Sequence, residues 1–165
     1  MKTDPSNTNV IAIDPGYDRI GIAIFNAQGL AHSECFIPHS KVFTERLLEI
    51  KNHIQALIRM HTPSVLALET LFFSKNQKTA LKVAEARGVI CISALELGLR
   101  LYEYSPQAVK SAVTGSGNAD KTSVIKMVEL LQPLSSRKRL DDEFDAIALG
   151  IAHRAGFRLS PPLST

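Results

Sequence analysis

Cysteine is scarce in this chain of 165 residues, and tryptophan is missing from it. The two cysteines, Cys35 and Cys91, lie far apart and have no second Cys or His at the spacing of a metal ligand, which argues against a disulfide scaffold and a zinc site. No apolar run approaches the length of a membrane span, and Met1–Asn9 is polar, without the apolar core of a secretory signal. We therefore expect a soluble cytoplasmic protein with no membrane partner.

An excess of charge of one sign is also lacking. The chain has 19 Lys and Arg against 16 Asp and Glu, a formal net charge of +3, which permits a polyanionic partner without requiring one. A chain of this length with 45% hydrophobic residues can bury one good core and is short for two. We expect a single domain over residues 10–157, with flexible segments at residues 1–9 and 158–165.

Apolar patterning predicts strands and helices that alternate along most of the chain. Strands are expected at residues 10–13, 20–25, 65–68 and 101–104, and helices at residues 44–60, 78–99, 106–113, 122–131 and from 142 to about 155. The turn-forming stretch Asp14–Tyr17 joins the first two strands, which indicates a β-hairpin. Thr44 is expected to cap the first helix, and Leu131 to face the core. This order of elements implies an α/β domain with a mixed sheet.

Four acidic residues stand where the expected strands and helices end or begin. Asp14 follows the first strand and Glu69 follows the strand at residues 65–68. Each has an ordinary explanation, because Asp before Pro-Gly often starts a turn and a Glu at a strand end can point into solvent. Asp142 and Asp145 share one side of a helix start, where acidic side chains interact favourably with the helix dipole. Taken singly, none of the four requires a function.

The combination of the four carboxylates indicates more than their separate positions do. Two carboxylates at sheet ends and a helical pair can converge on one point in an α/β fold. Oxygen ligands of this kind suit Mg²⁺ or Mn²⁺, and two such ions roughly 4 Å apart clamp the attacking water and the leaving oxygen of a phosphodiester. Without a cation, like charges at this distance repel by about 4 kcal/mol at an effective dielectric of 20. The residues themselves therefore indicate a metal-assisted phosphodiesterase.

Five segments carry a more specific pattern. They are Ile11–Gly16, Glu69–Asn76, Ala80-Leu81 with Glu85–Gly88, Pro106–Gly117 and Asp142–Ala148, within a region from Val10 to about His153. In order and spacing these segments resemble the RuvC family of crossover junction endodeoxyribonucleases. The resemblance implies a ribonuclease-H-like fold, with a mixed five-stranded sheet flanked by helices.

The same resemblance implies a function and partners. The expected function is resolution of Holliday junctions in recombination and repair, by symmetric nicking of two strands of a four-way junction that leaves 5′-phosphate and 3′-hydroxyl ends. The resemblance also implies a homodimer and a branch-migration complex as a further partner. The helix that carries Ala84 and Gly88 offers a small-residue face, which makes it the candidate dimer interface.

The resemblance assigns roles residue by residue. Asp14, Glu69, Asp142 and Asp145 become the catalytic and metal-binding carboxylates, holding two Mg²⁺ ions, with Mn²⁺ as the alternative metal. Asp142 is the ligand most open to replacement, because its neighbour Asp141 lies near the same helix face.

Four further residues are expected to bind nucleic acid. Phe72 matches an aromatic residue near the branch point, where a ring can stack on bases or wedge between them; core packing is the alternative. Lys75, Lys110 and Lys121 match basic positions that face DNA phosphates, and a solvated surface role is the alternative for any one of them. Thr70 departs from the family, in which Gln is more frequent at this position.

Two other functions stay open at this point. One is a ribonuclease-H-like nuclease for RNA–DNA hybrids or other branched DNA. The other is a catalytically inactive junction-binding scaffold, against which the complete set of four carboxylates argues. The five histidines show no paired spacing for a metal, so surface or packing roles are expected for all of them.

Overall fold

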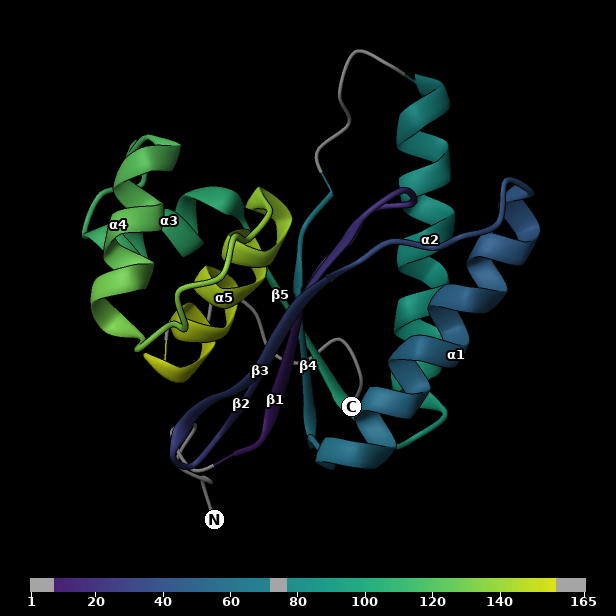
Figure 1. Cartoon of the computed structure of the whole chain (residues 1–165), viewed down its shortest axis with the longest axis horizontal. Helices are drawn as coiled ribbons and strands as arrows, with labels where there is room; N and C mark the ends of the chain where they lie inside the picture. The colour runs from purple at the N-terminus through teal and green to yellow at the C-terminus, as the bar shows by residue number, and fades with distance from the viewer. Residues whose placement is uncertain (1–7, 72–76, 157–165) are drawn as a thin grey trace.

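The computed structural model describes residues 8–71 and 77–156, and its elements form three layers (Figure 1). The chain order is β1 (Val10–Asp14), β2 (Ile20–Asn26), β3 (Gly29–Phe36), α1 (Phe43–His61), β4 (Val65–Glu69), α2 (Gln77–Leu95), β5 (Arg100–Tyr104), α3 (Pro106–Thr114), α4 (Lys121–Leu131) and α5 (Asp141–Arg154). Helices α1 and α2 lie on one side of the sheet, and α3, α4 and α5 on the other. The segments expected to be flexible fall almost wholly outside the described residues, so their flexibility stays a prediction.

The sheet is mixed and has five strands in the order β3-β2-β1-β4-β5. β1, β2 and β3 form an antiparallel meander, while β4 and β5 run parallel to β1. The expected mixed sheet and the hairpin of the first two strands are confirmed. Patterning alone did not place β3, because this edge strand is only half-buried and has no continuous apolar run. It forms because β2 supplies its hydrogen-bonding partner.

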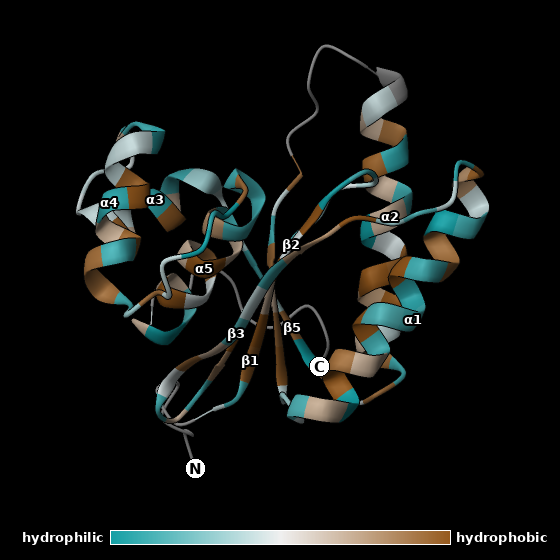
Figure 2. Ribbon diagram, in the orientation of Figure 1, coloured by the Kyte–Doolittle hydropathy of each residue, from teal (hydrophilic) through white to brown (hydrophobic). Residues whose placement is uncertain are grey.

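The two faces of the sheet bury different kinds of side chain. The face under α1 and α2 is lined with large residues such as Ile11, Ile13 and Leu68. The opposite face carries small residues, including Ala12, Ala23 and Ala67, and meets further alanines of α5. Figure 2 shows the apolar strands between the two helical layers. Small residues on both sides let α5 approach the sheet closely.

In the described part of the chain, no helix has the length and apolar character needed to span a membrane.

Three details differ from the sequence predictions. α1 begins at Phe43 with Val42 as its N-cap and no capping side chain, so Thr44 is not the cap. α2 ends at Leu95 rather than at residue 99, because a turn at Gly98, with φ of 79°, leads into β5. Leu131 is 45% exposed and does not face the core, and the buried residues of α4 are Val124 and Val128.

Candidate active site at the ends of the central strands

Asp14 and Glu69 occupy matching positions at the ends of two neighbouring parallel strands. β1 and β4 pair in parallel from Val10 with Val65 to Ile13 with Leu68, and each acidic residue is the last residue of its strand. Side chains alternate between the faces of a strand, so both carboxylates fall on the alanine-lined face, which α5 covers. The alternation that builds the core therefore also brings these two carboxylates together.

Gly21 lets the start of α5 rest directly on β2 beside this pair. Gly21 pairs with Asp14 across the β1–β2 hairpin. A methyl group on Gly21 would lie 1.8 Å from the carbonyl oxygen of Asp142, a distance that no side chain can occupy. The absence of a side chain at this one position thus sets how near the acidic turn of α5 comes to Asp14. Sequence reasoning missed this role, which depends on a contact between residues far apart in the chain.

The three aspartates of α5 differ in their surroundings. The Asp142 side chain is 20% exposed, and its Oδ2 lies 3.3 Å from Nε of Arg19. The Asp145 side chain is 35% exposed, and its Oδ2 lies 3.3 Å from Nζ of Lys121. Asp141 is 64% exposed and also lies 3.3 Å from Lys121. Asp142 and Asp145, but not Asp141, raise the pKa of Asp14 by their charge. This geometry favours Asp142 over Asp141 as a member of the cluster.

Burial and mutual repulsion shift the acidity of the cluster. Burial raises the pKa of Asp14 to about 7, and the charges of Glu69, Asp145 and Asp142 add to this shift. Burial and the charge of Asp145 raise the pKa of Glu69 to about 7, against the opposing charges of Lys110 and Lys121. The pKa of Asp145 is also raised, chiefly by burial. Carboxylates with raised pKa values that gather at the ends of neighbouring strands are characteristic of a functional site.

Replacement of Glu69 by Gln is expected to raise the melting temperature of the metal-free protein at pH 8. Folding raises the pKa of Glu69 from its ordinary value of 4.5 to about 7, so the wild-type loses stability as pH rises through that interval. Gln does not titrate, so the advantage of the variant should grow over the same interval and then level off. Thermal unfolding in EDTA between pH 4.5 and 8 measures this difference. A large drop in melting temperature at pH 8 would show that Glu69 is structurally paired instead.

Two of the predicted DNA-contacting lysines lie at the carboxylate cluster. Lys110 of α3 and Lys121 at the start of α4 line a hollow of about 230 Å³ together with Glu69 and Asp145. A second hollow, of about 270 Å³, is lined by Asp14, Glu69 and the β4–α2 segment up to Leu71. Glu69 therefore lies between two openings that are large enough for phosphate groups.

The loop after β4 begins with Thr70, whose backbone N–H and hydroxyl both donate to the carbonyl of Tyr104, at 2.9 and 3.3 Å. Thr70 thus ties the end of β4 to β5, next to Glu69. Phe72 and Lys75, which the sequence predicts to bind nucleic acid, lie outside the described residues.

The carboxylate cluster is balanced by cations of the protein itself. Arg19 lies at one end of the cluster and Lys121 at the other. Within residues 8–71 and 77–156, no three Asp, Glu, His or Cys side chains stand close enough together to form a ready metal cage. The donor set nevertheless fits a hard divalent cation, because it offers only carboxylate oxygens, crowded enough to raise their pKa values. Arg19 was missed by sequence reasoning, since nothing in its own neighbourhood predicts a partner on α5.

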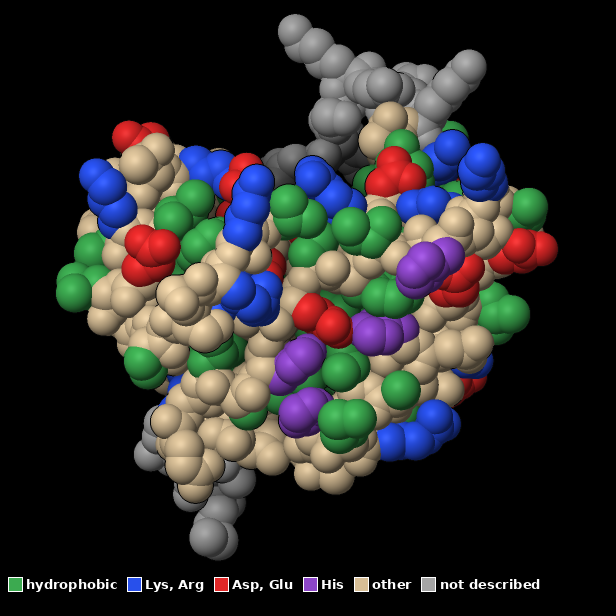
Figure 3. All heavy atoms as spheres, viewed as in Figure 1, with side chains coloured by type: hydrophobic (Ala, Val, Ile, Leu, Met, Phe, Trp, Pro, Cys, Tyr) green, Lys and Arg blue, Asp and Glu red, His purple; other side chains and the backbone are tan. Residues whose placement is uncertain are grey.

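The histidines lie away from the carboxylates. Figure 3 shows histidines gathered on the face over β3 and α1. There His53 Nε2 lies 2.5 Å from one oxygen of Glu34, and His32 lies 3.6 Å from the other. His153 is buried and its Nδ1 shares a hydrogen bond of 2.7 Å with the hydroxyl of Tyr104. The interactions of these three histidines are the surface and packing roles expected from the sequence.

Comparisons with known proteins identify the family of this chain. The family model for the crossover junction endodeoxyribonuclease RuvC matches residues 10–153. A RuvC of Brachyspira hyodysenteriae is 40% identical over 90% of this chain and 95% of its own, and one of Caldicellulosiruptor saccharolyticus is 38% identical over 87% and 90%. The structure of T. thermophilus RuvC in complex with Holliday junction substrate superposes with a TM-score of 0.85 at 29% identity, covering 95% of this chain and all of the other.

Fold and site together define a nuclease of the ribonuclease-H-like class, in which acidic side chains gather at the ends of the central strands. Within that class the chain belongs to the RuvC family of crossover junction endodeoxyribonucleases, whose members are divalent-metal-dependent enzymes.

Proposed function

We propose that this protein resolves Holliday junctions by cutting two strands symmetrically at a four-way DNA junction. The observation that carries the proposal is the juxtaposition of Asp14 and Glu69 on adjacent strands, with α5 held against them. The solved relative bound to junction substrate shares this fold over nearly the whole chain. Cutting of this kind serves homologous recombination and DNA repair.

In the proposed mechanism the four carboxylates Asp14, Glu69, Asp142 and Asp145 hold two Mg²⁺ ions, or Mn²⁺ in their place. When bound, such ions activate a water molecule and stabilise the charge that develops on the leaving oxygen. Arg19 and Lys121, which neutralise Asp142 and Asp145 in the metal-free protein, are then free to turn toward DNA. The products carry 5′-phosphate and 3′-hydroxyl ends.

The lysines of the site orient the DNA backbone. Lys110 and Lys121 line the hollow beside Glu69, so a phosphate placed there meets two cations and lies next to the carboxylates. Lys75 is proposed to extend this contact, and Phe72 to stack on bases at the branch point. Because phosphate contacts carry no sequence information, they position the strand and leave cleavage preference to other contacts.

The test of function is incubation with synthetic four-way junctions labelled on each strand in turn, with Mg²⁺ or Mn²⁺. We expect nicks at symmetric positions in two opposite strands and products that DNA ligase reseals. A linear duplex, a three-way junction and an RNA–DNA hybrid of matched sequence serve as controls. Cleavage of the hybrid in preference to the junction would favour the alternative ribonuclease-like function, and junction binding without cutting would favour an inactive scaffold.

We further propose that two copies associate through α2, whose solvent side carries an unusual apolar stripe. Leu81, Ile92 and Leu95 are 63%, 49% and 41% exposed, and a methyl group on Gly88 would meet nothing within 4 Å. Together with Glu85 these positions are spaced four and three residues apart, the repeat by which two helices pack along a common seam. A dimer with two active sites accounts for paired cuts.

Replacement of Ile92 by Asp is expected to convert the dimer into a monomer, because it places a charge on an apolar position of this seam. Sedimentation equilibrium at micromolar concentration should give twice the chain mass for the wild-type and the chain mass for the variant. Leu130→Asp, at a leucine of α4 that is 77% exposed and away from α2, is the matched control. A monomeric wild-type with intact junction cleavage would contradict the dimer.

A branch-migration complex as partner, and a cytoplasmic location, stay predictions.

A further inference from the structure

Glu143 is a buried acid that the proposed mechanism does not use. It follows Asp142 directly, and it is 1% exposed. Successive residues of a helix point about 100° apart, so the Glu143 side chain leaves α5 in a different direction from the Asp142 and Asp145 pair. A buried carboxylate is costly unless it is paired and hydrogen-bonded.

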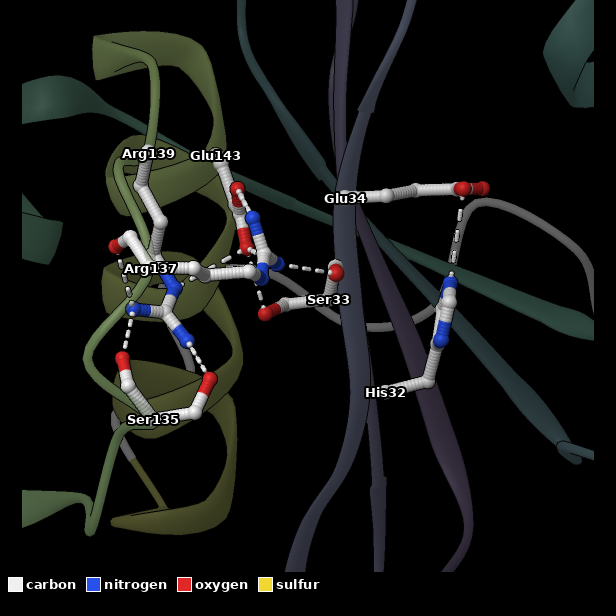
Figure 4. A network of polar contacts seen from close by, with 7 residues as sticks. All are labelled: His32, Ser33, Glu34, Ser135, Arg137, Arg139 and Glu143. Carbon is white, nitrogen blue, oxygen red and sulfur yellow. Dashed lines mark hydrogen bonds and ion pairs between the residues drawn. The ribbon is translucent and has the colours of Figure 1, made fainter.

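Two arginines and a serine surround the Glu143 carboxylate (Figure 4). Arg137 contacts both of its oxygens, with Nη1 2.9 Å from Oε2. Nε of Arg139 lies 3.2 Å from Oε1, and the Ser33 hydroxyl donates to the same oxygen at 2.6 Å. The Arg139 side chain is itself only 6% exposed. Every partner thus approaches one carboxylate that projects from the first turn of α5.

The arginines also anchor this network to the rest of the fold. Arg137 donates to the carbonyl of Ser33 in β3 at 2.7 Å. Arg139 donates to the carbonyl and the hydroxyl of Ser135, at 2.8 and 3.0 Å. The network therefore joins an edge strand, the α4–α5 loop and the first turn of α5.

The other ionic contacts of the first turn of α5 are ion pairs with Arg19 and Lys121, whose side chains are about half exposed. The N-cap residue of α5, Leu140, has no side-chain cap, so the usual hydrogen bond that fixes a helix start is missing. Gly21 lets Asp142 lie directly against β2, which fixes how close the helix comes to the sheet but not how it is rotated about its axis. Rotation of this turn is resisted by the apolar face of α5 packed on the sheet and, at its polar side, by the buried Glu143 network attached to β3.

We propose that Glu143 is a positioning residue, which with Arg137, Arg139 and Ser33 sets the rotation of the first turn of α5 and so aims Asp142 and Asp145 at the metal. The inference rests on the proposed function, in which these two aspartates are metal ligands. A roll of the helix would move both ligands at once. Groups that orient metal ligands typically change metal affinity about 10- to 100-fold when they are removed.

The first test is Glu143→Gln, which keeps the shape of the side chain but turns an amide NH₂ toward guanidinium donors. Mn²⁺ binding to the DNA-free protein, measured by electron paramagnetic resonance, should weaken about 10- to 100-fold. The Mn²⁺ concentration for half-maximal junction cleavage should rise in parallel, while junction affinity in Ca²⁺ stays within about threefold. Glu34→Gln is the matched control, because Glu34 neighbours Ser33 in β3 but points away from Glu143 (Figure 4) and contacts His53 of α1.

Arg137→Ala separates positioning from a simple effect of charge, and it remains informative if Glu143→Gln does not fold. Arg137 is 46% exposed, and its loss leaves the Arg139 contact with Glu143 in place. Removing a positive charge near the site strengthens Mn²⁺ binding if only through-space electrostatics operates. Removing a positioning contact weakens it instead.

We expect weaker Mn²⁺ binding in Arg137→Ala and in Glu143→Gln, and unchanged binding in Glu34→Gln. Unchanged or tighter binding in Arg137→Ala, or equal losses in the Glu34 control, would overturn the positioning role. Failure of the wild-type to bind Mn²⁺ would instead contradict the proposed metal site itself.

Discussion

Asp14→Asn is expected to abolish strand cleavage, lowering the rate constant by at least about a thousandfold, while junction binding survives. Asp14 is the carboxylate on which the charges of the other three converge, so its loss removes the ligand at the centre of the proposed site. The amide keeps the size of the side chain and relieves the repulsion. The metal-free variant should therefore melt no lower than the wild-type at pH 8.

Single-turnover cleavage of a labelled junction measures the first effect, and a gel-shift titration in Ca²⁺ measures binding. Asp141→Asn is the matched control, since Asp141 is mostly exposed and does not act on Asp14. We expect that control to retain cleavage within about threefold, as surface substitutions usually do. Persistent cutting by Asp14→Asn would refute the proposed mechanism, and a large loss in Asp141→Asn would exchange the roles assigned to Asp141 and Asp142.

Gly21→Ala is expected to have the second largest effect, although it adds a single methyl group. That methyl would lie 1.8 Å from the Asp142 carbonyl oxygen, so β2 and α5 must separate by about 1.5 Å or more to reach ordinary contact at about 3.5 Å. Overpacking of a close contact typically costs about 1–3 kcal/mol. A displacement of this size at catalytic groups can lower the rate about a hundredfold.

Chemical denaturation and single-turnover cleavage at saturating Mn²⁺ together measure both effects of Gly21→Ala. Gly150→Ala provides the comparison, because a methyl group there would meet the Phe25 ring at 2.2 Å, beyond Asp145 toward the other end of α5. We expect it to lose stability to a similar extent but to retain most of its cleavage. Equal losses of activity in the two variants would mean that general destabilisation, and not the distance from Asp142 to β2, controls the site.

The parts of the fold predicted from sequence are those that local patterns determine. Continuous apolar runs identify the buried strands β1, β2 and β4, and helical periodicity identifies the five helices seen in residues 8–71 and 77–156. β3 was not identified because its stability comes from pairing with β2 and not from its own composition. The prediction of Thr44 as the cap of α1 was wrong for a related reason, because the segment before this helix is held by a residue within the helix. Glu49 accepts hydrogen bonds from the backbone N–H groups of His39 and Ser40.

The candidate site also contains residues that local sequence patterns predict and residues that they do not. The positions of Asp14 and Glu69 follow from strand ends and the two-residue alternation of side chains, both of which are legible in the sequence. Asp142 and Asp145 were assigned by resemblance, since a helical pair of acids has an ordinary explanation. Arg19, Gly21 and Glu143 were missed because each acts through one contact with a distant segment. Sequence spacing carries no information about such contacts.

The placement of α5 has a consequence for synthesis of the protein. This helix covers β1 and β2, which leave the ribosome long before it does, and it carries Asp142 and Asp145. Until α5 docks, the alanine-lined face of the sheet is bare and the cluster has only Asp14 and Glu69. A nascent chain therefore lacks the full set of four carboxylates that we propose to hold the metal ions, and we expect cutting activity to appear only when α5 has packed against the sheet.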